Sequence, residues 1–228
     1  MTSRGHGAGS SGPGTEPTLL VLAKEPVAGR VKTRLVPDLT PDQAARLAAA
    51  ALADTLEAVM AAPARRRLVV LDGRPGDWLP AGIEVAPQVS GGLDRRLAAA
   101  FAGVRGPAVL VGMDTPQILP ADLQVDFGAV DSWLGPAVDG GYWLIAMRDP
   151  EPGVFPGVPM STSSTYQVQH ARLLTSGRTV GDCRLLRDVD TIADARVVAA
   201  QVPATRFARA LASFGADQSS TQLARPGC

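Results

Sequence analysis

Four basic side chains lie close together near the start of the chain, in the stretch Ala-Lys-Glu-Pro-Val-Ala-Gly-Arg-Val-Lys-Thr-Arg that spans residues 23–34. Lysine and arginine form charge-assisted hydrogen bonds with phosphate oxygens, and the glycine lets backbone N–H groups approach an anion closely. The stretch therefore predicts a phosphate-binding loop, with a solvated basic loop as the alternative. The predicted phosphate-binding residues are Ala23, Lys24, Gly29, Arg30, Lys32, Thr33 and Arg34.

This loop follows neither of the two common phosphate-binding patterns. Residues 23–34 contain neither the Gly-x4-Gly-Lys-Ser/Thr spacing of a P-loop nor the Gly-x-Gly-x-x-Gly dinucleotide fingerprint. They do follow the apolar run at residues 18–23 directly. Ligands of open α/β sheets bind beyond the carboxyl ends of the strands, so this position favours phosphate binding.

Aspartates follow two later apolar runs. Asp114 comes at the end of the run that begins at residue 108, and Asp188 and Asp190 follow residues 183–186. Carboxylate oxygens are hard ligands for Mg²⁺ or Mn²⁺, and Mg²⁺ commonly takes one or two of them together with phosphate oxygens. The three aspartates are therefore the predicted metal ligands. The alternatives are a turn at the first aspartate and an ordinary helix start after the last.

Two further motifs have the chemistry of an acceptor site. Asp139 is followed by Gly-Gly-Tyr, which predicts either a hairpin turn or a site where the aspartate acts as the acceptor's general base. A run of hydroxyl residues at 161–163 either binds an anionic group of the acceptor or caps a helix. The predicted acceptor-binding residues are Gly140, Gly141, Tyr142, Ser161, Thr162 and Ser163, and the predicted catalytic residues are Lys32, Asp114 and Asp139.

The elements that must position these residues alternate between strands and helices. Apolar runs predict strands at residues 18–23, 67–71, 83–86, 108–111, 134–138, 142–147 and 183–186. Helices are predicted from the capping box at 40–43 to about 63, at 93–102, after Pro120, at 162–175 and at 205–214. This order predicts an α/β fold with a mostly parallel central sheet flanked by helices.

Composition narrows the class of protein. Lys+Arg and Asp+Glu both number 22, which argues against nucleic-acid binding through a basic face, and no apolar run approaches the length of a membrane span. The two cysteines, Cys183 and Cys228, are far apart, so we expect a reducing, cytoplasmic location.

We expect a disordered N-terminal extension at 1–17, one domain at 18–214 and a flexible tail at 215–228. The oligomeric state is left open, a homodimer included.

The motifs at residues 23–35, 112–116, 139–142 and 188–191 together resemble the radical-SAM/selenodomain-associated transferase 1 family, which is glycosyltransferase-like. That family belongs to the nucleotide-diphospho-sugar transferase superfamily, so the resemblance implies a glycosyltransferase-A-type Rossmann-like sandwich. The loop at 23–34 also resembles that of 2-phospholactate and phosphoenolpyruvate guanylyltransferases. The resemblance implies that Gly91, Gly92 and Leu93 lie where related enzymes read the nucleobase, although residues 91–96 depart from the family's usual order.

The residues and the resemblance leave three functions open. The first is nucleotidyl transfer from a nucleoside triphosphate to a small phosphorylated or acidic acceptor, with release of pyrophosphate. The density of positive charge at 23–34 favours it. The second is glycosyl transfer from a nucleotide sugar, which the family label favours. The third is a non-catalytic nucleotide-binding module. Both transferase hypotheses require Mg²⁺ or Mn²⁺ as a cofactor.

Overall fold

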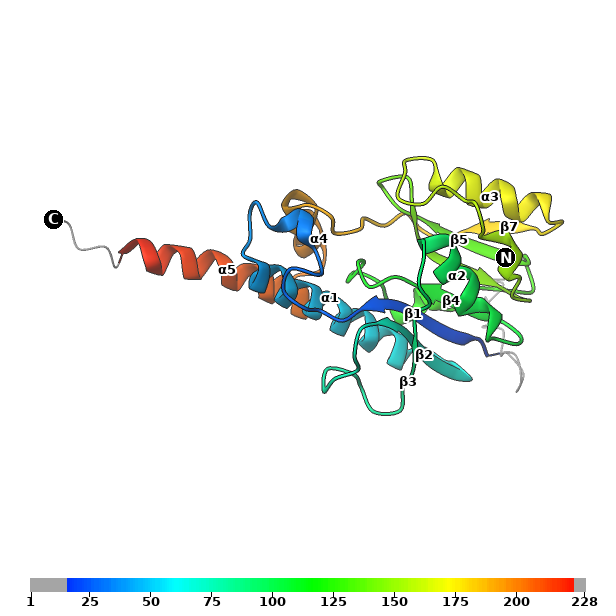
Figure 1. The fold of residues 1–228 in the computed structure, drawn as a ribbon, viewed down its shortest axis with the longest axis horizontal. Coiled ribbons are helices and arrows are strands. Elements are labelled where there is room, and N and C mark those ends of the chain that lie inside the picture. Colours follow the sequence, from blue (N-terminus) through cyan, green and yellow to red (C-terminus); the bar gives the residue numbers. More distant parts are fainter. Residues whose placement is uncertain (1–15, 224–228) are drawn as a thin grey trace, which may run out of the picture.

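A seven-stranded sheet forms the centre of the protein (Figure 1). The computed structural model describes residues 16–223, so the predicted extension at 1–17 lies outside the described residues apart from its last two. The strands, in the spatial order β3-β2-β1-β4-β6-β5-β7, are β1 (Thr18–Lys24), β2 (Arg66–Asp72), β3 (Glu84–Pro87), β4 (Ala108–Val111), β5 (Ser132–Pro136), β6 (Tyr142–Met147) and β7 (Val180–Asp182). All neighbours are parallel except that β6 is antiparallel to β4 and β5, which confirms the predicted mostly parallel sheet.

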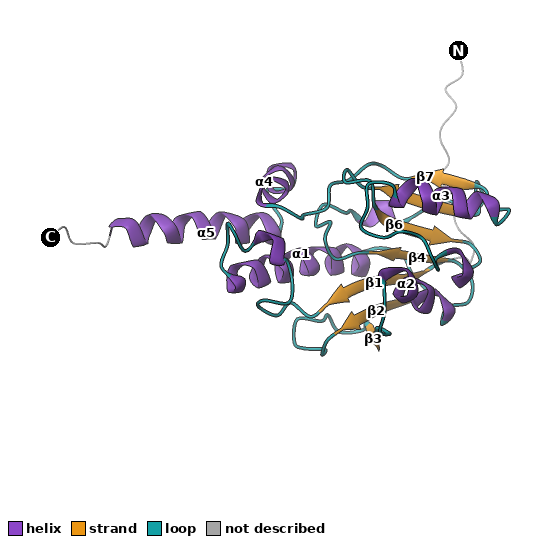
Figure 2. Cartoon of the chain, turned by 45° about the horizontal axis from the view of Figure 1, so that its top comes forward, coloured by secondary structure: helices purple, strands orange, loops and turns teal. Residues whose placement is uncertain are grey.

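Helices cover both faces of this sheet. They are α1 (Pro41–Ala61), α2 (Leu93–Ala102), α3 (Thr165–Thr175), α4 (Ile192–Gln201) and α5 (Arg206–Leu223). Helix α1 packs on one face through a cluster that includes Leu52, Leu56 and Val59, and Figure 2 shows α2 and α3 lying over the other face. This layering confirms the predicted α/β sandwich.

The chain forms α1 where the sequence predicts a helix start. The Thr40 hydroxyl accepts a hydrogen bond from the backbone N–H of Gln43 at 3.2 Å, and the Gln43 side chain accepts one from the Thr40 N–H at 2.9 Å. Pro41 occupies the first helical position, where its missing N–H costs no hydrogen bond. This capping box fixes where α1 begins, and thereby how long a loop can run from β1 to α1.

Helices α4 and α5 pack against the N-terminal half of α1 as a third apolar cluster that includes Leu47, Val198 and Phe207. The Asp54 side chain, on α1, accepts hydrogen bonds from the backbone N–H groups of Arg206 at 3.0 Å and Phe207 at 2.8 Å. A carboxylate at a helix N-terminus is stabilised by the exposed N–H groups there. The C-terminal segment is therefore held to the sheet domain by both polar and apolar contacts.

Several predicted boundaries are wrong. The helix predicted after Pro120 is a single 3-10 turn, Pro120–Leu123, and α3 begins three residues later than expected, at Thr165. The last strand is Val180–Asp182 rather than 183–186. Residues 183–186 follow it and join the sheet through a hydrogen bond from the Cys183 N–H to the Leu134 carbonyl at 2.8 Å and an isolated bridge at Leu186. Helix α5 runs to Leu223, well past the predicted end at 214 (Figure 1), so the first part of the predicted flexible tail is helical.

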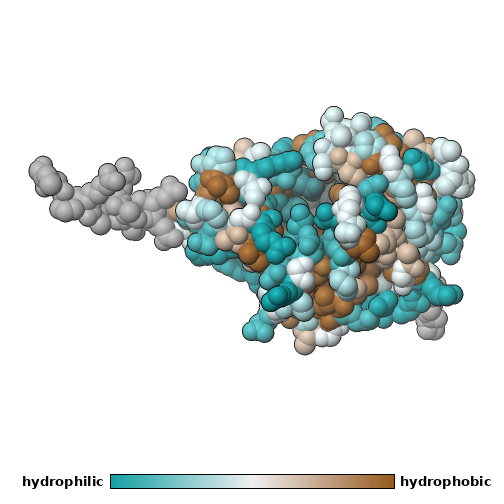
Figure 3. Space-filling view, viewed as in Figure 1, coloured by the Kyte–Doolittle hydropathy of each residue, from teal (hydrophilic) through white to brown (hydrophobic). Residues whose placement is uncertain are grey.

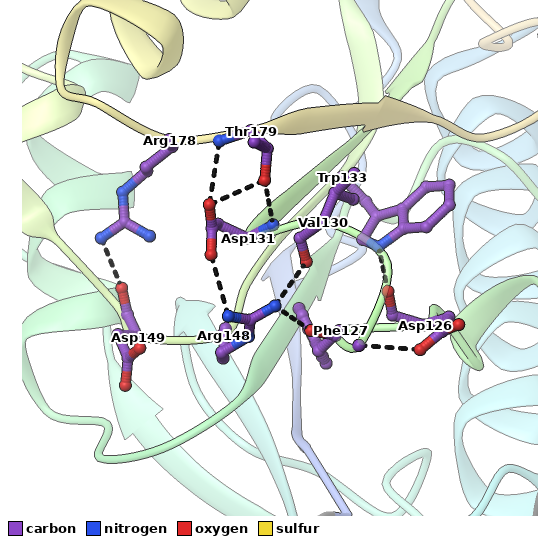
Figure 4. A network of polar contacts seen from close by, with 10 residues as sticks. Asp126, Phe127, Val130, Asp131, Trp133, Arg148, Asp149, Arg178 and Thr179 are labelled. Carbon is purple, nitrogen blue, oxygen red and sulfur yellow. Dashed lines mark hydrogen bonds and ion pairs between the residues drawn. The ribbon is translucent and has the colours of Figure 1, made fainter.

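A polar network fastens the edge of the sheet that lies opposite the carboxyl ends of β1 and β4 (Figure 4). The Asp131 carboxylate accepts hydrogen bonds from the backbone N–H and the hydroxyl of Thr179, at 2.9 and 2.7 Å, and pairs with Arg148 at 3.0 Å. The bonds from Thr179 hold the pKa of Asp131 below its usual value. The network holds the starts of β5 and β7 against the end of β6. It lies at the end of the sheet opposite to the carboxyl ends of β1 and β4.

Within the described residues, no helix has both the length and the apolar character that a membrane crossing requires.

Candidate functional site

A cleft of about 540 Å³ opens at the carboxyl ends of β1 and β4, where the sequence predicts the ligand. It brings together most of the predicted site residues from separate parts of the chain. The lining includes Ala23, Lys24, Arg30, Lys32, Thr33, Arg34, Leu93, Asp114, Asp139, Gly141, Tyr142, Ser161, Asp188 and Asp190. Figure 3 shows one face of the molecule, on which hydrophilic and hydrophobic residues gather in separate areas around a hollow.

Lys32 is the most enclosed cation of the loop. Its side chain is only 7% exposed, and its ammonium lies 2.5 Å from Asp114 Oδ1 and donates to the backbone carbonyl of Val189. The residue adopts the left-handed conformation, with φ 49° and ψ 37°, at the start of the 3-10 turn Thr33–Leu35. A non-glycine residue has a conformational cost there, and the ammonium contacts hold it in place. The loop thus delivers one positive charge to the floor of the cleft.

Asp188 lies near the ammonium of Lys32, but its carboxylate is incompletely hydrogen-bonded. Its Oδ1 is buried and has no hydrogen-bond partner among residues 16–223. Burial, together with the nearby carboxylates of Asp114 and Asp139, raises the pKa of Asp188 to about 7, and the ammonium of Lys32 opposes this change. The backbone N–H of Val189 donates to the Asp114 carbonyl at 3.0 Å, which fixes the two segments side by side. A buried carboxylate oxygen that lacks a hydrogen bond, next to a second carboxylate, suits the binding of a divalent cation.

The third predicted metal ligand has a different partner. The Asp190 carboxylate pairs with Arg34 at 2.9 Å, and both side chains are substantially exposed. Among the described residues, no three Asp, Glu, His or Cys side chains group closely enough to hold a metal ion. The three aspartates therefore do not form one ligand set in this structure. Asp114 and Asp188 still fit a cation that takes its other ligands from water and phosphate.

The loop's outer cation also has a partner. Arg30, which is more than half exposed, lies 3.9 Å from the Asp72 carboxylate at the end of β2. A pair at this separation and exposure contributes little to stability. Arg30 is therefore available to an anionic ligand at small cost.

Asp139 lies in the turn that joins β5 to β6, so the hairpin prediction is confirmed. Its Oδ1 accepts a hydrogen bond from the Gly141 N–H at 2.8 Å, and the Gly140 N–H donates to the Ala137 carbonyl at 3.0 Å. The same turn places the Asp139 carboxylate in the cleft lining. The two predictions for Asp139, a hairpin turn and a residue that faces the ligand, are therefore compatible with each other.

Gly140 serves packing in this structure and does not line the cleft. Its φ is 89°, and a Cβ built there would lie 2.2 Å from the carbonyl oxygen of Ser163. The backbone N–H of Tyr166 donates to the Gly140 carbonyl at 2.9 Å. The absent side chain lets the hairpin rest directly on the start of α3.

We expect Gly140→Ala to lower the free energy of unfolding by about 3 kcal/mol or more, since it adds a backbone clash to a left-handed φ. Urea denaturation measures the change. Gly157→Ala is the matched control: Gly157 has φ 79° with nothing within 4 Å of its Cβ position, so only about 1 kcal/mol is expected. Equal losses in the two variants would contradict the packing role.

Other predicted site residues also lie away from the lining. Gly29 has φ 77°, which supports its predicted role in turning the loop, but it does not face the cleft. Gly91 and Gly92 lead into α2, with Gly92 at its N-cap, and only their neighbour Leu93 reaches the lining. Thr162 and Ser163 are not part of the cleft lining either. Neither caps α3, because the N-cap residue is Ser164 and makes no side-chain capping bond.

Several polar residues of the lining were not predicted, Gln88 and Arg96 among them. Gln88 follows β3 directly, and its amide nitrogen donates to the carbonyls of Ala23 at 2.7 Å and Val70 at 3.0 Å. Arg96, on α2, donates to the Gly91 carbonyl at 2.9 Å and reaches the Gln88 side-chain oxygen at 3.4 Å. The rule that ligands bind beyond strand ends points to Gln88, whereas nothing in the sequence marks Arg96. Further unpredicted lining residues are Met113, Thr115, Trp143 and Met160.

A family model described as "Uncharacterized protein conserved in bacteria (DUF2064)" matches residues 43–162, more than half of the chain. The chain belongs to the DUF2064 family. The matched part of this DUF2064 protein runs from α1 through Asp114 and the Asp139 turn, and it stops before Asp188. No curated protein matches the chain.

Solved structures share the fold. A proposed nucleotide-diphospho-sugar transferase from Desulfovibrio desulfuricans G20 is 27% identical, with a TM-score of 0.77 over 90% of this chain and 96% of that one. A nucleotidyl transferase from Methanothermobacter is 17% identical, with a TM-score of 0.54 over 86% and 99% of the two chains. A CMP:2-keto-3-deoxy-manno-octonic acid synthetase complexed with CTP is 13% identical, with a TM-score of 0.52 over 82% and 98%.

These likenesses confirm the predicted fold class, and the 27% identical neighbour agrees with the predicted nucleotide-diphospho-sugar transferase superfamily. The Desulfovibrio neighbour, the one of these three above 25% identity, supports the prediction that this DUF2064 protein is a transferase. The two neighbours below 25% identity show only that the fold is shared. The reaction must therefore be argued from the residues of the cleft.

Proposed function

We propose that this protein is a metal-dependent nucleotidyltransferase. An oxygen of a small phosphorylated or acidic acceptor attacks the α-phosphorus of a nucleoside triphosphate, the bond to the bridging oxygen of the β-phosphate breaks, and pyrophosphate leaves. The observation that carries this proposal is the enclosed ammonium of Lys32, held at the floor of the cleft beside Asp114 and Asp188. A buried cation beside paired carboxylates suits a ligand that brings both phosphates and a metal ion.

Each part of the loop has a role in this proposal. The ammonium of Lys32 binds the phosphates on the cleft floor, and the more exposed Lys24, Arg30 and Arg34 balance the remaining charge at its mouth. Asp114 and Asp188 would hold Mg²⁺ or Mn²⁺, which neutralises charge on the leaving pyrophosphate. An acidic acceptor is already ionised, so it needs no general base. Catalysis then consists mainly of positioning and charge neutralisation.

The second candidate is glycosyl transfer from a nucleotide sugar. It is favoured by the Desulfovibrio neighbour, whose proposed activity is that of a nucleotide-diphospho-sugar transferase. In this reaction the acceptor is a hydroxyl, and the Asp139 carboxylate in the cleft would take its proton. The same loop would then bind a diphosphate in place of a triphosphate.

The donor distinguishes the two candidates. We expect nucleoside triphosphates with Mg²⁺ or Mn²⁺ to raise the Tm of the protein more than matched nucleotide sugars do, because stabilisation grows with the tightness of binding to the folded state. Differential scanning fluorimetry with a panel of both donor classes measures this. Stabilisation by nucleotide sugars alone would establish the second candidate. No stabilisation by either class would reject both.

A further inference from the structure

One wall of the cleft is apolar. It includes Leu22, Leu110 and Ile145 on the neighbouring strands β1, β4 and β6 and Leu97 on α2, of which Leu97, Leu110 and Ile145 are almost fully buried and Leu22 is partly exposed. Tyr142 and Met160 form its outer side, and both are half-buried and pack on the cluster beneath them. This group, Leu22, Leu97, Leu110, Tyr142, Ile145 and Met160, is called the apolar wall below.

The part of the apolar wall on β6 and residues 160–165 differs in charge from the rest of the cleft. The lining that β6 and residues 160–165 contribute carries no charged side chain within the described part of the chain. Two of its hydroxyls are already engaged: the Tyr142 hydroxyl donates to the Gln169 side chain at 3.3 Å, and the Thr165 hydroxyl donates to the Pro159 carbonyl at 2.8 Å. A ligand with many hydroxyl groups would leave most of them unpaired here, which costs binding free energy.

The other direction along the cleft has a different character. From the Lys32 floor towards β3, the lining is polar and carries, beside Gln88, the Arg96 guanidinium, which has N–H groups beyond those that bond to Gly91 and Gln88 and can hydrogen-bond to the polar edge of a base. From the same floor towards β6, it offers the apolar wall, with Asp139 on the turn just before Tyr142. In an in-line displacement at the α-phosphorus, the attacking acceptor oxygen lies opposite the leaving pyrophosphate, so the body of the acceptor extends away from the donor's β- and γ-phosphates. The β3 side therefore suits the donor's base, and the β6 side suits the acceptor.

We infer that the acceptor is a small acid with an apolar or aromatic body, not a sugar or another polyhydroxylated molecule. This inference rests on the proposed function. The body of the acceptor packs against the apolar wall, and its acidic group points to the floor of the cleft near Lys32. Burial of an aromatic ring against such a wall contributes most of the affinity, whereas the hydroxyl groups of a competitor that met the same apolar side chains would lose their hydrogen bonds to water.

The test compares two probes that share one phosphate, phenyl phosphate and glucose 1-phosphate, by isothermal titration. We expect phenyl phosphate to bind about tenfold more tightly or better, the discrimination typical of an apolar pocket. We also expect it to bind while the site is saturated with Mg²⁺ and a non-hydrolysable nucleoside triphosphate. Equal or tighter binding of glucose 1-phosphate would overturn the inference. Exclusion of phenyl phosphate by the nucleotide would assign the apolar wall to the donor's base and would also overturn it.

A variant checks the location. Met160→Glu places a charge in the apolar wall and is expected to weaken phenyl phosphate binding about tenfold or more. Leu174→Glu is the control: Leu174 lies on α3, is 51% exposed and does not line the cleft, so its phenyl phosphate affinity should equal that of the wild type. Unchanged phenyl phosphate affinity in Met160→Glu contradicts the assignment.

The proposed function and this inference fail in different ways. If no nucleotide stabilises the wild type, the proposed function fails. If nucleotides bind and the affinities for phenyl phosphate and glucose 1-phosphate do not differ, only this inference fails.

Discussion

Replacing Lys32 with alanine is expected to weaken binding of the Mg²⁺–nucleotide complex by about 10- to 100-fold. A charge-assisted hydrogen bond contributes about 1.5–3 kcal/mol, and here the ammonium is enclosed and shielded from water. The substitution also leaves the Asp114 carboxylate without its cation on the cleft floor, which adds repulsion against the donor phosphates. Titration calorimetry with the nucleotide that gives the largest thermal shift measures the change.

The control for this prediction removes a cation from a comparable ion pair far from the cleft. Arg66 pairs with Glu84 at 2.7 Å between β2 and β3, and neither residue lines the cleft. Arg66→Ala should leave nucleotide affinity unchanged. A loss of affinity as large in Arg66→Ala as in Lys32→Ala would show a general effect of charge, and an unchanged affinity in Lys32→Ala would refute the phosphate-loop assignment.

The second large effect is one of stability: Asp188→Asn is expected to make the metal-free protein more stable at pH 8, by about 1–3 kcal/mol. The folded protein holds the pKa of Asp188 at about 7, against an ordinary value of 3.8. The folded state therefore binds a proton that the unfolded chain has already lost between about pH 4 and pH 7. Stability falls as the pH rises through this window, because a difference of one in pKa between the folded and unfolded states corresponds to about 1.4 kcal/mol. Asparagine has no charge to bury, so the variant avoids this loss.

Urea denaturation at several pH values, with a chelator present, measures that difference. Added Mg²⁺ or Mn²⁺ should stabilise the wild type at pH 8 and leave Asp188→Asn almost unchanged, because the cation compensates the charge that the variant lacks. Asp131→Asn is the matched control. Hydrogen bonds from Thr179 lower the pKa of Asp131, so its carboxylate stabilises the fold above the ordinary pKa of an aspartate, and the substitution should destabilise the protein at pH 8. A less stable Asp188→Asn variant at pH 8 would contradict the predicted cost of the buried carboxylate.

Much of the fold follows from local patterns. The uninterrupted apolar runs at β1 and β4 and the capping box at Thr40 mark these elements almost to the residue, because buried strands and helix starts impose strict local requirements. The prediction is wrong where a boundary depends on distant contacts. Residues 183–186 look like a strand, yet β7 lies just before them, where Thr179 and Asp131 fix the pairing with β5.

The sequence by itself determined which residue types meet at the cleft. A basic loop after the first strand and aspartates after later strands must converge, because the carboxyl ends of parallel strands share one edge of the sheet. Only the tertiary structure decided how they meet. It placed Lys32 against Asp114, paired Asp190 with Arg34 and left a buried Asp188 oxygen without a hydrogen-bond partner in the part of the chain that the structure describes. It also assembled the apolar wall from three strands, a helix and a loop, since side chains that are far apart in sequence share a surface only after the sheet has formed.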